Sequence, residues 1–186
     1  MAIKMNLYLA GFMGTGKSTI GKELAKLLGR QFIDMDSLLE KKLGMTVKEV
    51  FEKNGEVFFR QEEKILAIEL SATANKIVAC GGGTILDTDV YKAFSKSGLV
   101  ICLFTDKDQL IQRLERTSKR PLLQGAPVEE KVDELLKERA KIYEKITIRV
   151  NTTDLTPKDA AKKIVDLLKT RQRILDKLQS QYIVIS

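Results

Sequence analysis

The stretch GFMGTGKS at residues 11–18 constrains the fold more than any other part of the sequence. It fits the pattern G-x-x-x-x-G-K-[ST], and it lies between an apolar run typical of a strand and a segment of helical period. Its glycines let the chain curl so that N–H groups point at phosphate oxygens, and the following helix adds the partial positive charge of its N-terminus. The pattern predicts a phosphate-binding P-loop, in which Lys17 reaches the β and γ phosphates and Ser18 ligates Mg²⁺.

Five short apolar runs alternate with longer segments of helical period. We expect strands at 6–10, 32–35, 77–80, 99–104 and 146–150. Three of these runs are almost continuously apolar, as strands buried on both faces are. The alternation predicts an α/β fold of the P-loop NTPase type, with a parallel sheet of about five strands and helices on both faces. Ligands of such sheets bind beyond the carboxyl ends of the strands.

Several helix ends carry recognisable signals. Residues 17–28 have helical period and are followed by Gly29, a C-cap glycine. Thr46 and Glu49 have the spacing of a capping box. Pro157 occupies the first position expected of the last long helix. These signals fix the boundaries of three predicted helices.

Two segments interrupt the regular alternation. Residues 37–75 predict two or three helices, which is too much for a simple crossover and indicates a helical substrate-binding insertion. Residues 119–128, KRPLLQGAPV, hold two of the three prolines and a glycine, and predict a mobile lid loop. No internal repeat or low-complexity linker occurs, so we expect a single P-loop domain over residues 1–186.

Composition excludes several classes of protein. The chain has 186 residues, of which 44% are hydrophobic, enough for one compact globular domain. It has no histidine and no Cys-x-x-Cys spacing, which excludes zinc sites and histidine acid–base chemistry. No stretch approaches the roughly 18 continuous apolar residues that would span a bilayer, and the N-terminus does not resemble a signal peptide. We therefore expect a cytoplasmic protein with no membrane partner.

The formal net charge of +7 has two interpretations. It is either a solvated, slightly basic surface or a sign of sites for polyanions, such as nucleotide phosphates or nucleic acid. No dense basic run with interleaved aromatic residues occurs, and aromatic residues make up only 6% of the chain. We therefore expect no nucleic-acid partner.

Two aspartates stand at the end of the second predicted strand. If Phe32, Asp34 and Asp36 alternate along that strand, both carboxylates lie on one face, where ligands bind. Two like charges this close repel unless a cation intervenes. Mg²⁺ on the side of Asp34, together with a hydroxyl substrate, would explain the pair. The alternative is that Asp36 only caps the helix opening at Ser37 and that Asp34 is a surface charge.

Arg139 is the most informative charge in the chain. The residues three and four positions from it are Leu135, Leu136, Ile142 and Tyr143. Helical geometry therefore directs its guanidinium into an apolar stripe, with no local carboxylate to pair with. A buried unpaired guanidinium is costly, so an anion must come from elsewhere. The alternative is a side chain whose charged end extends to water.

Three further arginines are candidates for ligand contacts. Arg60 has Glu56 and Glu63 at helical spacing, so it is either a surface ion pair or part of a second-substrate site in the insertion. Arg120 in the lid could close over the phosphates as an arginine finger, or it could be a solvated loop charge. Arg113 could stack on adenine, although a solvated helix face is the simpler interpretation.

Taken together, these motifs resemble those of the shikimate kinase family, over nearly the whole chain up to about residue 170. The matching segments, in the family's order and spacing, are GFMGTGKSTIG at 11–21, DMD at 34–36, FFRQEE at 58–63, GGG at 81–83, RPLL at 120–123 and KERAKIY at 137–143. Only the first is specific by itself, and the set is strong. The resemblance implies transfer of the ATP γ-phosphoryl group to the 3-hydroxyl of shikimate in aromatic amino-acid biosynthesis, with ATP and Mg²⁺ bound.

The resemblance also implies a role for each candidate residue. Nucleotide contacts would come from Gly14, Thr15, Gly16, Lys17, Ser18, Thr19, Arg113 and Arg120. Shikimate contacts would come from Asp36, Arg60, Gly81, Gly82, Gly83 and Arg139. The catalytic residues would be Lys17, Asp36 and Arg120, and the metal-side residues Ser18 and Asp34. Asp36 would polarise the hydroxyl, both substrate arginines would clamp the carboxylate, and Glu63 would orient Arg60.

Two features depart from the family pattern. Many members carry an arginine near the adenine in the loop before the last helix, whereas NTTDLTP at 151–157 has none. Residues 171–186 exceed what the family requires.

The nearest alternative is another small-molecule P-loop kinase, such as a gluconate or nucleoside-monophosphate kinase. A regulatory GTPase is excluded, because D-x-x-G and N-K-x-D are both absent. We expect a monomer.

Overall fold

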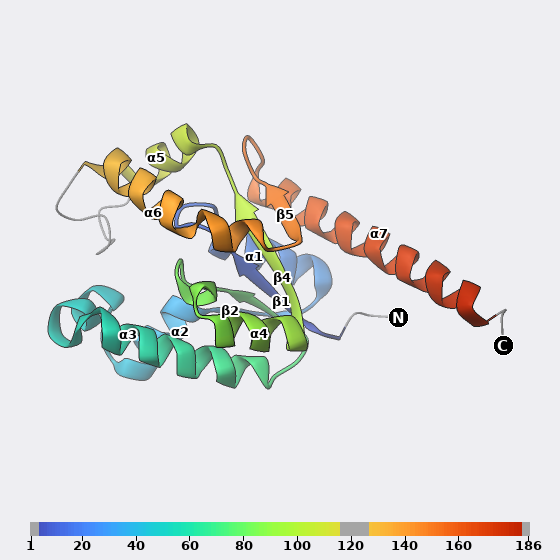
Figure 1. Ribbon diagram of the computed structural model, residues 1–186, viewed down its shortest axis with the longest axis horizontal. Coiled ribbons are helices and arrows are strands. Elements are labelled where there is room, and N and C mark those ends of the chain that lie inside the picture. The colour runs from blue at the N-terminus through green and yellow to red at the C-terminus, as the bar shows by residue number, and fades with distance from the viewer. Residues whose placement is uncertain (1–3, 116–126, 184–186) are drawn as a thin grey trace.

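The computed structural model describes residues 4–115 and 127–183, with side chains as far as residue 173. One parallel sheet runs through the described residues, in the strand order β2-β3-β1-β4-β5, with helices against both faces (Figure 1). The strands are β1 (Asn6–Ala10), β2 (Gln31–Asp34), β3 (Lys76–Ala79), β4 (Gly98–Phe104) and β5 (Ile148–Asn151). The predicted α/β class and the five parallel strands are confirmed.

Three helix ends lie where the sequence signals predict them. In chain order they are α1 (Lys17–Leu28), α2 (Met35–Leu43), α3 (Val47–Ser71), the short 3₁₀ helix η1 (Thr84–Leu86), α4 (Thr88–Ser97), α5 (Lys107–Glu115), α6 (Val128–Glu144) and α7 (Pro157–Ile183). Gly29 ends α1 in the left-handed conformation, with φ 62°. The Thr46–Glu49 capping box is present before α3. These predictions are confirmed.

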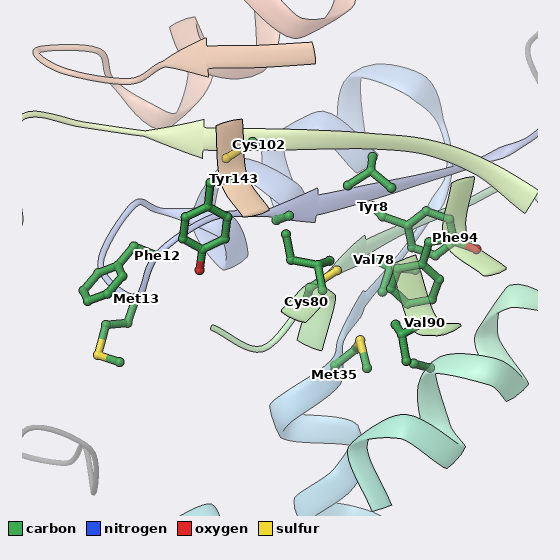
Figure 2. Packing of buried hydrophobic residues seen from close by; sticks show 14 of the residues in the cluster. Tyr8, Phe12, Met13, Met35, Val78, Cys80, Val90, Phe94, Cys102 and Tyr143 are labelled. Carbon is green, nitrogen blue, oxygen red and sulfur yellow. The ribbon is translucent and has the colours of Figure 1, made fainter. Parts of the chain in front are cut away.

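The core consists of two apolar clusters, one on each face of the sheet. Because side chains alternate along a strand, Leu7 and Leu9 of β1 point into one cluster, to which α1 and α7 also contribute. Tyr8 faces the other, where helices α2 to α6 pack. Figure 2 shows part of this second cluster, in which the rings of Tyr8 and Phe94 stack with centroids 3.8 Å apart. Strands buried on both faces explain the continuous apolar runs of the sequence.

The insertion predicted at 37–75 is helical. It corresponds to α2 and α3, and Gly55 interrupts α3 with φ 82° and ψ 170°. Figure 1 places both helices on the side of the sheet that also carries α4. The lid predicted at 119–128 falls outside the described residues as far as 126, and α6 begins at Val128.

One strand boundary was predicted too early. The sequence indicates a strand from residue 146, but β5 begins at Ile148. Ile146 is buried in the core, which explains its apolar character, yet its N–H donates to Tyr143 O at the end of α6. It therefore belongs to the turn and not to the strand. Among the described residues, no helix is long and apolar enough to cross a membrane.

Candidate active site

The P-loop lies where the sequence predicts it, between β1 and α1. Gly11 has φ 130°, and a Cβ there would stand 2.2 Å from Leu103 O, so no larger residue fits. Gly16, with φ 91°, leads directly into α1 and offers no side chain to cap it. The first N–H groups of α1 therefore face the loop without a side-chain cap, which is the arrangement that binds phosphate.

A pocket of about 440 Å³ opens above this loop at the carboxyl ends of the strands. Its lining consists of residues 14–20, Asp34, Asp36, Cys80, Gly82, Arg113, Thr152, Leu155 and Pro157. Every nucleotide-binding residue predicted within the described part of the chain lies in this lining. The pocket therefore brings the loop, both aspartates and the middle glycine of the GGG turn to one space.

The ammonium group of Lys17 lies over the loop that precedes it. Its Nζ donates to Gly11 O and Phe12 O, each at 2.9 Å. These two contacts hold the charge at the mouth of the phosphate cradle instead of in bulk water. An arriving polyphosphate would meet a cation already in place.

The arrangement of the two aspartates differs from the prediction. Strand β2 ends at Asp34, and Asp36 lies in the first turn of α2, so the two do not alternate along a strand. The carboxylate that caps α2 belongs to Asp34, whose Oδ1 accepts from Ser37 N at 3.3 Å. Asp34 Oδ2 accepts from the Ser18 hydroxyl. Both carboxylates nevertheless reach the same pocket.

The hydroxyl of Ser18 and the carboxylate of Asp34 form a pair of oxygen ligands that suits a magnesium ion. The described residues contain no group of three or more acidic, cysteine or histidine side chains that could hold a metal alone. Mg²⁺ in kinases uses one or two protein oxygens and takes its other ligands from phosphates and water. The Ser18 hydroxyl and the Asp34 carboxylate, already in contact at the edge of the pocket, match that requirement.

Arg113 connects α5 to the P-loop. Its Nη1 donates to Gly14 O at 3.3 Å and its Nη2 to Gln109 Oε1 at 3.1 Å. The side chain lines the pocket, which a fully solvated helix face would not do. Arg120 lies outside the described residues.

Some lining residues were not singled out from the sequence. Thr152 is buried, and its hydroxyl donates to Phe104 O at 3.0 Å and Thr15 O at 3.4 Å. The only sequence signal for it was that the loop at 151–157 departs from the family pattern. Cys80 is also buried in the lining, and burial raises the pKa of its thiol, so the thiol stays neutral.

Arg139 is buried, as its place in the apolar stripe predicts. The residue is 3% exposed, and its guanidinium carbon lies 5.6 Å from the centre of the Phe12 ring. Nη1 donates to Gly82 O at 3.1 Å. Its Nε is buried and has no hydrogen-bond partner among the described residues. With a buried Nε that lacks a partner among the described residues, this guanidinium is placed to accept an anion.

Arg60 is held from two sides by carboxylates of its own helix. Glu56 Oε1 accepts from Nε and Nη2, and Glu63 Oε2 accepts from Nη1 at 2.7 Å. Burial by itself would lower the pKa of Arg60, but the charges and hydrogen bonds of Glu63 and Glu56 outweigh it and raise the pKa. These bonds use three of its five N–H groups, so two remain for a ligand.

Glu63 is the buried centre of this arrangement. It is 4% exposed, and its second oxygen, Oε1, accepts from the Thr84 hydroxyl at 2.6 Å. Thr84, also buried, follows the GGG turn directly. The contact of Glu63 with Arg60 was expected. The bond from Thr84 to Glu63 was not predicted, because the two residues are 21 positions apart and share no sequence pattern.

The GGG turn lies between these groups, with no room for side chains at its ends. A Cβ on Gly81 would stand 2.3 Å from Glu63 Oε1 and 3.0 Å from Asp36 Oδ1. A Cβ on Gly83 would stand 2.6 Å from Arg60 Nη1. The turn therefore brings Asp36, Arg60 and Arg139 around one short stretch of backbone. The predicted acceptor residues within the described chain gather there.

The family model for shikimate kinase matches residues 13–169. The shikimate kinase of Thermodesulfovibrio yellowstonii is 40% identical over 160 residues, which cover 86% of this chain and 92% of that protein. The solved structure of the Acinetobacter baumannii shikimate kinase in complex with shikimate has a TM-score of 0.88 and 37% identity, and the match covers 91% of this chain and 96% of that one.

A gluconokinase from Sinorhizobium meliloti is similar in fold alone. Its structure has a TM-score of 0.53 at 14% sequence identity, over 92% of this chain and 99% of that one. The closer likeness lies with the shikimate kinases, in sequence over most of the chain and in structure. This chain belongs to the shikimate kinase family.

Proposed function

We propose that this protein is an ATP-dependent shikimate kinase. It transfers the γ-phosphoryl group of ATP to the 3-hydroxyl of shikimate, giving shikimate 3-phosphate and ADP on the route to chorismate and the aromatic amino acids. The observation that carries the proposal is the buried guanidinium of Arg139, with an unpartnered Nε, beside a glycine that lines the P-loop pocket. A substrate with a carboxylate would satisfy Arg139, and a ring hydroxyl of the same substrate would reach the P-loop pocket.

The nucleotide would bind through the loop and the start of α1. Backbone N–H groups at 14–19 receive the phosphates, and Lys17 stabilises the charge that develops on the transferring group. Ser18 and Asp34 would hold Mg²⁺, which neutralises phosphate charge when bound. Arg113, whose Nη1 donates to Gly14 O, would contact the adenine, and Arg120 would close over the phosphates.

The acceptor would bind at the GGG turn. Arg139 and Arg60 pair with the carboxylate of shikimate, since a guanidinium fork matches a carboxylate in shape and charge. Glu63 fixes the direction of Arg60 through the 2.7 Å bond to its Nη1. The backbone of Gly81, Gly82 and Gly83 lies against the substrate, because side chains there would occupy the space.

Asp36 orients the reacting hydroxyl and takes up its proton. The loose transition state of phosphoryl transfer needs little covalent help, so positioning is the larger part of this task. Asp36 lines the pocket from the first turn of α2, and its Oδ1 is directed to the side where Gly81 lies. Asp36 would therefore lie between the P-loop and the GGG turn.

A panel of acceptors tests the proposal. ADP formation is measured with ATP, Mg²⁺ and, in turn, shikimate, gluconate or a nucleoside monophosphate. We expect shikimate to support turnover and the other acceptors to give only background rates. Turnover with gluconate or a nucleotide, and none with shikimate, would assign the protein to a different group of kinases.

The remaining properties are part of the same proposal. We expect the enzyme to work as a monomer in the cytoplasm, with no nucleic-acid or membrane partner. Size-exclusion chromatography with light scattering checks the oligomeric state.

A further inference from the structure

Two side chains of α6 donate hydrogen bonds to the same backbone oxygen of the GGG turn. Tyr143 Oη lies 2.8 Å from Gly82 O, and Arg139 Nη1 lies 3.1 Å from it. The two side chains are four residues apart and so project from the same face of the helix. A carbonyl oxygen accepts two hydrogen bonds through its lone pairs. The peptide group that joins Gly82 to Gly83 is therefore held from the side of α6 by two donors.

The Tyr143 hydroxyl is well suited to hold this position. The residue is 8% exposed, and its ring lies in the apolar cluster that also contains Phe12 and Cys80 (Figure 2). Burial raises the pKa of Tyr143 to about 12, so the group remains a protonated donor at neutral pH. A buried tyrosine needs a partner for its hydroxyl, and Gly82 O provides it.

The orientation of this one peptide group affects both arginines of the acceptor site. The bond is trans, so the N–H of Gly83 points opposite to Gly82 O, away from α6. Arg60 lies tightly against Gly83, the second residue of this peptide group, where an added Cβ would stand 2.6 Å from its Nη1. Arg139 contacts the oxygen end of the same peptide group. A rotation of this group would move the contacts of both guanidinium groups at once.

We propose that Tyr143 is a positioning residue for the acceptor. Its hydroxyl holds the Gly82–Gly83 peptide group so that Arg60 and Arg139 are arranged for the substrate carboxylate before the substrate arrives. The inference rests on the proposed function. Without the hydroxyl, Arg139 is the only side-chain donor left at Gly82 O among the described residues, and binding must then reorder the turn.

The test compares two buried tyrosines that each lose one oxygen atom. Tyr143→Phe keeps the ring and removes the bond to Gly82 O. Tyr8→Phe is the matched control, because Tyr8 is 0% exposed and its hydroxyl bonds to Asn6 at 2.9 Å and Ser97 at 2.8 Å, in a different part of the same cluster. A loss of general stability would appear in both variants, and a loss of positioning only in Tyr143→Phe.

We expect the KM for shikimate to rise about 3- to 10-fold in Tyr143→Phe, the range that one hydrogen bond is worth. The Kd for shikimate, measured by calorimetry without turnover, should rise in parallel. The KM for ATP should stay unchanged in both variants, and Tyr8→Phe should lower the melting temperature without altering the shikimate constants.

Three outcomes separate the possibilities. An unchanged Kd for shikimate in Tyr143→Phe, with the unaltered enzyme active, would overturn the inference and leave the proposed function standing. Equal changes in the two variants would also overturn it, since the effect would then be one of stability. If the unaltered chain neither bound nor phosphorylated shikimate, the proposed function would fail, and the inference with it.

Discussion

Ser18 and Asp34 are joined by a hydrogen bond, from the hydroxyl at the start of α1 to the carboxylate at the end of β2. The other oxygen of Asp34 caps α2 through Ser37 N. One side chain thus ties the phosphate loop to the helix that carries Asp36. The proposed metal side and the proposed acceptor side of the pocket share this link, and the two aspartates should respond differently to substitution.

Asp36→Asn should impair chemistry more than binding. Asparagine keeps the size of the side chain but is not an anionic proton acceptor, so we expect kcat to fall by roughly 10²- to 10⁴-fold. The KM for ATP should stay nearly unchanged, because the phosphates are proposed to bind at residues 14–19 and not at Asp36. Steady-state kinetics at saturating Mg²⁺ measures both constants. Normal turnover would show that the acceptor hydroxyl is positioned elsewhere.

Asp34→Asn should produce a defect that added magnesium partly relieves. Asparagine caps a helix about as well as aspartate, so α2 should keep its start. The weaker metal ligand lowers the affinity for Mg²⁺, and a titration of rate against Mg²⁺ should shift to higher concentration. If the defect of Asp36→Asn were the one that magnesium relieved, the roles of the two aspartates would be reversed.

Lys17→Met should abolish most turnover and leave the fold intact. The ammonium acts on the charge of the transferring group, and loss of one such donor costs at least about 10²- to 10³-fold in kcat. Lys22→Met on the exposed face of the same helix is the matched control and should keep full activity. Near-normal rates in Lys17→Met would contradict the assignment of the loop.

The two substitutions of Arg139 should separate binding from stability. An ammonium cannot reproduce the guanidinium fork, so Arg139→Lys and Arg139→Leu should both weaken shikimate binding by roughly 30-fold or more. Arg139→Leu removes a buried, partly unpartnered charge and should keep or raise the melting temperature. Calorimetric titration and a thermal melt measure these effects. Normal shikimate affinity in either variant would exclude a carboxylate clamp at this position.

Gly81→Ala should destabilise the protein, and Gly82→Ala should not. The added methyl at 81 would meet Glu63 Oε1 at 2.3 Å, whereas at 82 its nearest neighbour is Arg139 Nη1 at 3.5 Å. Overpacking of this kind costs about 1–3 kcal/mol, which lowers the melting temperature by several degrees in a chain of this size. Equal melting temperatures for the two variants would show that Glu63 moves aside freely.

The fold could be predicted well because buried parallel strands appear as apolar runs. Strand β1 matches the predicted range, and the others begin or end within two residues of theirs. The error at Asp36 has a physical reason. Period-two alternation assumes that the strand continues, but the side chain of Asp34 bonds to Ser37 N and turns the chain into α2.

The site could be predicted only where its residues carry a local pattern. The P-loop is a continuous motif, and Arg139 stands out against its apolar helix face. Tyr143 belongs to that same face and looks like an ordinary core residue. Its bond to Gly82 O joins positions 61 apart in the sequence, and the partner is a backbone atom, which leaves no trace in residue type. Thr84 was missed because its bond to the Glu63 side chain also joins residues that are far apart in the sequence.

The product of the reaction gives the most direct test of the central claim. The purified protein is incubated with ATP, Mg²⁺ and shikimate. Phosphorus and proton NMR then show which hydroxyl of the product carries the phosphate. The amount of ADP formed is compared with the amount of shikimate consumed. We predict one ADP for each shikimate, with the phosphate on the 3-hydroxyl. ADP release without a phosphorylated shikimate, or phosphate on a different hydroxyl, would contradict the account.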